Sequence, residues 1–266
     1  MSSPDGFEPT TLPRLPKTPS LRIEGRRALI TGASRGIGLA AAAALAEAGA
    51  HVALLARSRS EVEAGAQAIR AAGGSAEAVV CDVLDSEAMA SMFAAQEPFE
   101  ILVNNAGTNR PKPLVEVTAE DFDAVMNLNV RAAYFVAQAV ARGMIAAGKR
   151  GSLIHMGSQM GHVGGRERTL YCASKWALEG MSKAMALDLA PFGIRSNTIA
   201  PTFTETAMTR PFLASKEFRE QTLGKIKLGR LGTVEDLMGA VVYLASSASA
   251  MVTGTSLLID GGWTAE

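Results

Sequence analysis

Short apolar segments alternate with longer amphipathic or alanine-rich segments along almost all of this 266-residue chain. Apolar runs of about 4–8 residues are typical of buried strands, and the longer segments of helices. Strand–helix alternation of this kind makes the strands parallel within one sheet and puts helices on both of its faces. The sequence therefore predicts an α/β fold with a doubly wound, parallel seven-stranded sheet. We expect strands at 27–31, 51–56, 77–81, 100–104, 151–157, 194–199 and 255–259, and helices at 36–48, 59–72, 86–95, 118–147, 170–190 and 233–246.

No linker rich in Pro, Gly or Ser and no run of charge divides residues 24–262, so we expect one domain over residues 24–266. Residues 1–23 contain several Pro and Thr and lack the apolar stretch of a secretory signal, which predicts an irregular N-terminal arm. Residues 201–232 form the longest stretch without a clear core strand. Because long connections inside compact domains are usually functional, we expect a lid there.

Charge and composition argue against several classes of partner. The chain has 26 basic and 26 acidic residues, so neither nucleic acid nor an anionic membrane is an expected partner. No apolar run approaches the ~20 residues that a membrane helix needs. Three histidines, His51, His155 and His162, show no metal-ligand spacing, and no metal site is expected. Cys81 and Cys172 are not expected to pair, which favours a reducing compartment, the cytoplasm.

A glycine-containing turn, Thr31-Gly32-Ala33-Ser34-Arg35-Gly36-Ile37-Gly38, separates the first strand from the first helix. Its three glycines permit tight turning and close approach of the backbone to a phosphate, while the helix start offers free N–H groups. The spacing differs from the Gly-x-Gly-x-x-Gly of the commonest dinucleotide fingerprint. Because the turn opens a long series of strand–helix units, we expect nucleotide binding rather than a purely structural turn.

Tyr171 and Lys175 stand four residues apart and therefore share one face of a helix. A nearby ammonium favours phenolate over phenol, so we expect the pKa of Tyr171 to be lowered. Such a tyrosine can give or take a proton at a substrate oxygen. Taken alone, the pair is more often a surface tyrosine beside a solvated lysine; the glycine turn and the other motifs reverse this and favour the catalytic interpretation.

Three further polar features lie at strand ends or on a buried helix stripe. The run Asn104-Asn105-Ala106-Gly107 follows the fourth strand, where it suits a ligand crevice, although Asn and Gly are also ordinary turn residues. Asn129 lies on the apolar stripe of helix 118–147, either as a core amide with satisfied partners or as one that orders a water near Lys175. Ser158 ends the fifth strand and could either hydrogen-bond the substrate oxygen or serve only in the turn.

Together these motifs, in their order and spacing, resemble the short-chain dehydrogenase/reductase family in its single-domain group, over residues 24–262. The resemblance implies a Rossmann fold, with Tyr171 as the catalytic acid/base and Lys175 lowering its pKa and holding the nicotinamide ribose. It also implies that Ser158 orients the substrate carbonyl or hydroxyl and that Asn129 supports a proton relay through water. The nicotinamide carries the hydride, while the protein supplies position and electrostatics.

The end of the second strand bears on the choice of cofactor. Ala56 stands where NAD-preferring members carry Asp, and Arg57 follows it, which favours the 2′-phosphate of NADP; Arg35 points the same way. Alternatively, Arg57 is only a solvated charge at a helix start. NADP(H) is thus favoured over NAD(H), and Asp82 is expected at the adenine amine. The expected cofactor site comprises Gly32, Ser34, Arg35, Gly36, Ile37, Gly38, Arg57, Ser58, Asp82, Val83, Asn105, Ala106, Gly107, Tyr171, Lys175, Pro201, Thr202, Thr204 and Thr206.

One departure from the family pattern concerns the substrate side. The family usually has Pro-Gly after the sixth strand, whereas this chain has Pro201-Thr202, which is expected to reshape the lid. The loops 159–170 and 203–228 should line the substrate pocket. A substrate carboxylate could bind Arg166 or Arg168, or these arginines could simply be exposed. The substrate candidates are Gln159, His162, Arg166 and Phe203.

These features predict an oxidoreductase that transfers a hydride between NADP(H) and a small-molecule carbonyl or secondary alcohol, namely a sugar acid, polyol or ketone. A 3-oxoacyl thioester reductase is the alternative, since it shares the motifs. A non-catalytic NADP-sensing protein is a further alternative, against which the complete Asn129, Ser158, Tyr171 and Lys175 set argues. The resemblance and the long helices 118–147 and 170–190 predict a homotetramer.

Overall fold

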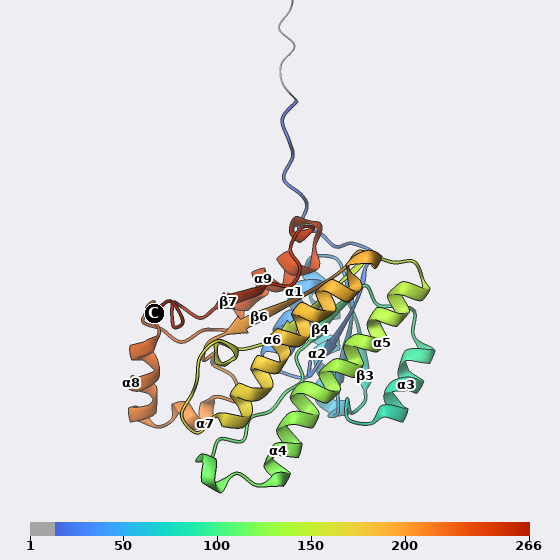
Figure 1. The fold of residues 1–266 in the computed structure, drawn as a ribbon. Helices are drawn as coiled ribbons and strands as arrows, with labels where there is room; N and C mark the ends of the chain where they lie inside the picture. The colour runs from blue at the N-terminus through green and yellow to red at the C-terminus, as the bar shows by residue number, and fades with distance from the viewer. Residues whose placement is uncertain (1–13) are drawn as a thin grey trace, which may run out of the picture.

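A computed structural model describes residues 14–266 of the chain. Most of the expected N-terminal arm, residues 1–13, lies outside the described residues. Residues 14–22 are exposed, contain neither helix nor strand, and lead away from the body of the protein (Figure 1).

All seven strands join one parallel sheet in the order β3-β2-β1-β4-β5-β6-β7, which confirms the predicted sheet. Sequence order runs outward in both directions from the β1–β4 pair. In open parallel sheets, ligands bind beyond the carboxyl ends of the strands at such a reversal. The strands are β1 (Arg27–Thr31), β2 (His51–Ala56), β3 (Ser75–Val80), β4 (Ile101–Asn104), β5 (Gly151–Met156), β6 (Ile194–Pro201) and β7 (Ser256–Ile259).

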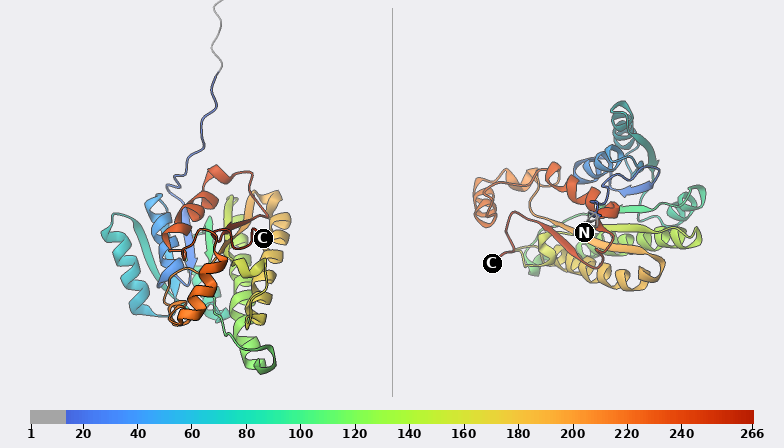
Figure 2. Two further views of the ribbon diagram at one scale, coloured as in Figure 1. Left: turned by 90° about the vertical axis from the view of Figure 1, so that its left-hand side faces the viewer. Right: turned by 90° about the horizontal axis from the view of Figure 1, so that it is seen from above.

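Helices cover both faces of this sheet (Figures 1 and 2). On one face α1 (Gly36–Glu47), α2 (Arg59–Ala71) and α9 (Glu235–Ala245) pack in a core that contains Ile30 of β1. On the other face α3 (Ser86–Ala95), α5 (Ala133–Ala146) and α6 (Thr169–Leu189) pack in a core that contains Leu29. Neighbouring residues of β1 thus enter opposite cores, as the alternation of side chains along a strand requires. The doubly wound arrangement is therefore confirmed.

The segment predicted as one helix over 118–147 has three parts. It begins as α4 (Ala119–Met126), which Thr118 and Asp121 cap reciprocally, passes through a π-helical segment at Asn127–Ala132, and continues as α5. A π turn accommodates an extra residue and frequently marks a functional site. Asn129 lies in this π segment, so the prediction of a uniform α-helix was wrong at the candidate site residue itself.

Two short helices interrupt the expected lid, α7 (Arg210–Leu213) and α8 (Lys216–Lys225), and neither was predicted. They lie beyond the edge of the sheet in Figure 1. Leu213, Ile226 and Leu231 form a small apolar cluster of their own in this region. Phe203 packs against that cluster and stacks on Trp263, with ring centroids 5.7 Å apart. Residues 201–232 are therefore a packed unit with its own small core.

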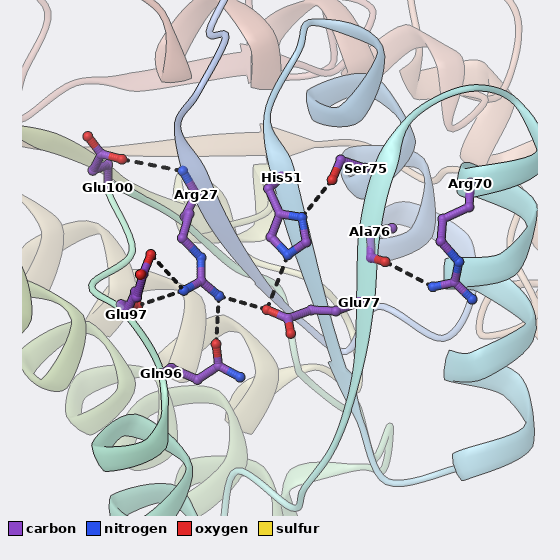
Figure 3. Close-up of polar contacts among 9 residues, drawn as sticks. All are labelled: Arg27, His51, Arg70, Ser75, Ala76, Glu77, Gln96, Glu97 and Glu100. Carbon is purple, nitrogen blue, oxygen red and sulfur yellow. Dashed lines mark hydrogen bonds and ion pairs between the residues drawn. The ribbon is translucent and has the colours of Figure 1, made fainter.

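At the amino edge of the sheet, a polar network ties β1, β2 and β3 to the C-terminal end of α3 (Figure 3). The Arg27 guanidinium donates to Glu77 Oε1 at 2.7 Å and to Gln96 Oε1 at 2.6 Å, and it lies over the Phe99 ring. His51 contacts the same Glu77 carboxylate at 3.3 Å. This network lies at the opposite ends of the strands from the glycine turn.

Among residues 14–266, no helix has the length and apolar character needed to cross a membrane. The same part of the chain contains no group of three or more His, Cys, Asp or Glu side chains that could hold a metal ion.

Candidate active site

The turn between β1 and α1 requires its glycines. Gly32 and Gly36 have φ of +63° and +57°, the left-handed region that other residues adopt only with strain. At Gly38 a Cβ would lie 2.3 Å from the Gly32 carbonyl oxygen. The turn can therefore close tightly on itself, which exposes the N–H groups at the start of α1 to a ligand.

Thr31 joins this turn to the loop after β4. Its hydroxyl accepts hydrogen bonds of 3.0 Å from the backbone N–H groups of Asn105 and Ala106. The Asn105 side chain returns two bonds, donating to the carbonyl oxygens of Thr31 at 3.0 Å and Gly32 at 3.1 Å. Two of the predicted cofactor motifs therefore form one unit. Sequence reasoning missed the role of Thr31, although its place at a strand end beside the glycines was a usable signal.

Tyr171 and Lys175 begin the face of α6 that looks toward the end of β5. The Lys175 ammonium donates to the Met156 carbonyl oxygen at 2.7 Å and lies 5.5 Å from the centroid of the Tyr171 ring. Burial lowers the pKa of Lys175 to about 8. Burial also raises the pKa of Tyr171, and the neighbouring Ser158 side chain only partly opposes this shift. The expectation of a lowered pKa for Tyr171 is therefore wrong, because desolvation of the phenol dominates.

Asn129 is fully engaged by protein partners. Its amide oxygen accepts from the Thr108 backbone N–H at 2.8 Å, and its amide nitrogen donates to the Thr108 carbonyl at 2.9 Å and the Ser174 hydroxyl at 3.0 Å. Ser174 in turn donates to the Tyr171 carbonyl oxygen at 2.8 Å. Asn129 thus links the loop after β4 to the first turn of α6. This matches the alternative of a core amide with satisfied partners.

A buried carboxylate lies one helical turn beyond Lys175. Glu179 accepts from the Thr198 hydroxyl at 2.7 Å and from the Ser256 hydroxyl at 3.2 Å. His162, a substrate candidate, lies 3.0 Å from the same Ser256 hydroxyl and 3.5 Å from Glu179. Glu179 partly opposes the lowering of the Lys175 pKa by burial. Sequence reasoning overlooked Glu179, which its position four residues after Lys175 could have indicated.

Two adjoining pockets open at the carboxyl ends of β4, β5 and β6, and both are lined by Ser158, Tyr171, Thr202, Met208 and Thr209. The first, which we call the Lys175 pocket, is further lined by Ile37, Asn105, Gly107, Thr108, Met156, Gly157, Lys175, Pro201, Thr204 and Thr206. The second, the Arg168 pocket, is further lined by Asn109, Gln159, Met160, Arg168, Phe203 and Phe212. The Tyr171 and Ser158 side chains thus stand where the two pockets meet.

The structure brings most, but not all, of the expected residues to these pockets. Of the substrate candidates, Gln159 and Phe203 line the Arg168 pocket. His162 and Arg166 line neither pocket: His162 is turned toward β7, and Arg166 is exposed on the loop before α6. Met208, Thr209 and Phe212 were missed individually, because which lid residues turn inward depends on how α7 packs.

The remaining predicted cofactor residues lie at the ends of β1, β2 and β3. Arg57 is 76% exposed, with its guanidinium 3.7 Å from the Asp82 carboxylate. Arg35 is also exposed and lies 3.5 Å from Glu61. Ser58 is the N-cap of α2 but makes no capping hydrogen bond. The exposed side chains of Arg35 and Arg57 therefore place two positive charges at this end of the sheet. Two guanidinium groups suit a phosphate group better than a ribose hydroxyl.

A glycine turn at a parallel-sheet reversal, next to a tyrosine–lysine pair, defines a nicotinamide-dependent oxidoreductase. A family model described as enoyl-(acyl carrier protein) reductase matches residues 32–264. The chain belongs to the short-chain dehydrogenase/reductase family.

Its similarity to individual members extends over nearly the whole chain. Gluconate 5-dehydrogenase of Gluconobacter oxydans is 41% identical over 91% of this chain and 96% of that protein. D-erythrulose reductase of Gallus gallus is 39% identical over 92% and 98%. The crystal structure of a gluconate 5-dehydrogenase from Burkholderia cenocepacia, in complex with NADP and tartrate, superposes with a TM-score of 0.87 at 38% identity, covering 92% and 98% of the two chains.

Proposed function

We propose that this protein interconverts a carbonyl and a secondary alcohol on a sugar acid, polyol or ketone, with NADP(H) as the hydride carrier. The observation that carries the proposal is the position of the Tyr171 and Ser158 side chains at the junction of the Lys175 and Arg168 pockets. One pocket leads to the glycine turn and the other to the lid, so a substrate oxygen at the junction meets both hydroxyls. Relatives that act on gluconate and erythrulose support this substrate range.

The residues of the Lys175 pocket fit a nicotinamide nucleotide. The Lys175 side chain lines this pocket, and a Cβ at Gly38 would lie 2.3 Å from the Gly32 carbonyl oxygen, so only a bare backbone fits where a phosphate would approach. When bound, the nicotinamide supplies or accepts the hydride. Lys175, Asn105, Thr204 and Thr206 would hold it, and Arg35, Arg57 and Asp82 would hold the adenosine end.

The protein's own contribution is to place and move a proton. Because burial keeps the phenol of Tyr171 protonated, the hydroxyl is ready to donate its proton to the substrate oxygen during reduction. The Ser158 hydroxyl orients that oxygen. Lys175 holds its charge near the ring and stabilises the phenolate left behind. In the oxidative direction the same phenolate takes the proton from the alcohol.

NADP(H) is preferred because Arg57 follows the end of β2 and Arg35 lies in the turn after β1, while Ala56 offers no carboxylate to a ribose hydroxyl. Three structures of relatives contain NADP, which supports the preference.

Residues 201–232 act as a lid in this proposal. Their contribution of Thr209 and Phe212 to the Arg168 pocket supports that role.

We also infer a homotetramer in the cytoplasm. Large apolar side chains are exposed along α4, α5 and α6, as a surface buried between subunits would require: Phe122, Tyr134, Phe135, Trp176 and Leu187. Neither Cys81 nor Cys172 forms a disulfide, in keeping with a reducing compartment. Light scattering should give four times the chain mass, and a monomer mass at micromolar concentration would refute the assembly.

The function is tested by following NADPH oxidation and NADP+ reduction over a panel of substrates. The panel contains sugar acids, polyols, ketoses, cyclic ketones, diketones and 3-oxoacyl thioesters. We expect turnover with polyols, ketoses or sugar acids and faster rates with NADP(H) than with NAD(H). Tight NADPH binding without turnover of any member would instead favour a sensor, and a preference for the thioesters would favour the acyl reductase alternative.

A further inference from the structure

Arg168 is a buried cation in the substrate half of the site. It directly precedes α6, three residues before Tyr171, and is only 8% exposed. Its guanidinium lies 5.1 Å from the centroid of the Phe212 ring and lines the pocket named after it. Stacking on an aromatic face fixes the plane of a guanidinium while leaving its N–H edge free.

The neighbouring Glu167 acts on this charge electrostatically, but no carboxylate of the described residues forms an ion pair with it. Within residues 14–266, no carboxylate lies within 4 Å of the Arg168 guanidinium, and its side chain donates no hydrogen bond. Nearby Arg110 differs, because it lies 3.2 Å from the Asp121 carboxylate. Burying an unpaired charge is costly, and desolvation lowers the pKa of Arg168 accordingly. An anion supplied from outside the protein would offset this cost.

The backbone is strained at Glu167, the residue directly before Arg168. Glu167, with φ of +56°, is the one residue other than glycine with positive φ in residues 14–266. Its carbonyl oxygen accepts from the Lys112 backbone N–H at 3.1 Å, which ties the turn to the loop after β4. Strained backbone of this kind clusters at ligand sites.

The same pocket contains two further polar atoms without partners. Asn109 Oδ1 and Thr202 Oγ1 are buried, make no hydrogen bond to the protein, and belong to side chains that line the Arg168 pocket. Buried polar atoms are normally paired, so each of these atoms is available to a ligand hydroxyl. A cation, an amide and a hydroxyl thus face one cavity beside Tyr171.

From this arrangement, and resting on the proposed function, we infer that the substrate is a polyhydroxy carboxylate, a sugar acid, whose carboxylate binds Arg168. Its hydroxyls meet Asn109 and Thr202 while one secondary alcohol reaches Tyr171. In the oxidative direction that alcohol loses a hydride from carbon to NADP+ and its hydroxyl proton to the Tyr171 phenolate, which leaves a keto acid, NADPH and the Tyr171 phenol. Neutral ketoses and polyols fit the same cavity but leave Arg168 unpaired.

The test compares substrates that differ only at one end of the chain. D-gluconate, its neutral counterpart D-glucitol and D-glucitol 1-phosphate are compared by kcat/KM with NADP+. Wild type should favour gluconate over glucitol by at least about 100-fold, since an unpaired buried charge rejects the neutral analogue. Arg168→Gln should lose about 100-fold on gluconate and less than about threefold on glucitol, the scale of a charged hydrogen-bond pair. Arg166→Gln, an exposed neighbour, should change neither.

The outcomes separate this inference from the proposed function. Equal or better use of glucitol by wild type, or an equal loss on both substrates in Arg168→Gln, would overturn the inference and leave the dehydrogenase intact. Preference for the phosphate would show that Arg168 selects a phosphate and not a carboxylate. If Arg168→Gln fails to fold, the wild-type ratio still decides. If nothing is turned over, the proposed function fails, and gluconate should still raise the Tm of the NADPH complex more than glucitol does; no such difference would overturn the inference as well.

Discussion

The Lys175 ammonium lies 5.5 Å from the centroid of the Tyr171 ring while it donates to the Met156 carbonyl oxygen at 2.7 Å. The end of β5 therefore holds the lysine in place before any ligand arrives. Burial shifts the two groups toward their neutral forms, raising the pKa of Tyr171 and lowering that of Lys175 to about 8. A protonated tyrosine is thus available at neutral pH, which suits it to donate a proton in the reductive direction.

Replacing Tyr171 by Phe should abolish turnover while leaving NADPH binding nearly unchanged, because the ring stays and only the proton-bearing oxygen is lost. Removal of a general acid costs about 100-fold or more in kcat. Lys175→Ala should damage both turnover and binding, since the lysine would also hold the ribose. Rates and a fluorescence titration with NADPH measure the two effects. A Tyr171→Phe enzyme that kept more than a few per cent of the wild-type rate would disprove the acid/base role.

Replacing Lys175 by Met should stabilise the protein most below pH 8. In the folded protein Lys175 loses its proton near pH 8, whereas in the unfolded chain it keeps the proton to about pH 10.5. Between these values the unfolded state binds more protons, so wild-type stability rises with pH. The advantage of Lys175→Met in free energy of unfolding should therefore be largest at pH 7 and shrink toward pH 10. Urea denaturation at several pH values measures it, and an advantage that is constant with pH would contradict the burial argument.

The third prediction concerns cofactor preference. Arg57→Ala should weaken NADPH binding by about tenfold and leave NADH binding almost unchanged, because an exposed arginine makes a partly screened contact with the 2′-phosphate. Ala56→Asp should weaken NADPH binding further and improve NADH binding. Fluorescence titration of the three proteins with both cofactors provides the measurement. If Arg57→Ala weakened both cofactors equally, or if wild type already preferred NADH, Arg57 would be only a solvated charge.

The network at the amino edge should matter for stability and not for catalysis. Arg27→Met removes charged hydrogen bonds to Glu77 and Gln96 from a side chain that is 16% exposed, which should lower the free energy of unfolding by about 2 kcal/mol. Arg22→Met is the matched control, because Arg22 is 60% exposed and pairs with Glu24 at the surface. Its effect should stay within about 0.5 kcal/mol. Similar losses in the two variants, measured in urea at one protein concentration, would count against the network.

The positions of the strands along the chain and of the glycine turn were accessible from the sequence because both are local patterns. Period and length identify strands and helices, and chain direction within a parallel sheet collects every strand end at one edge. This rule predicts that Ser158 and the loop after β4 lie at the same edge of the sheet. In the structure both line a pocket together with Tyr171.

What the sequence could not give depends on contacts between distant segments. The π segment around Asn129 is stabilised by bonds to Thr108 and Ser174, which no local pattern shows. The sign of the Tyr171 pKa shift follows from desolvation, which exists only once the surrounding segments pack. Arg168 and Arg166 look alike in the sequence, and only the folded structure shows that Arg168 is buried beside Phe212 while Arg166 is exposed.

The bonds of Thr31 to the loop after β4 also bear on how the protein gains its binding competence. Residues 31 and 105 are far apart in the chain, and β1 and β4 must pair before the hydroxyl can meet the Asn105 N–H. Parallel pairings of this range form late, because loop closure must precede them. Nascent or partly folded chains should therefore not bind the nucleotide. In the cell, the dinucleotide would then bind only the folded protein. It would slow proteolysis of the folded protein but would not make folding faster.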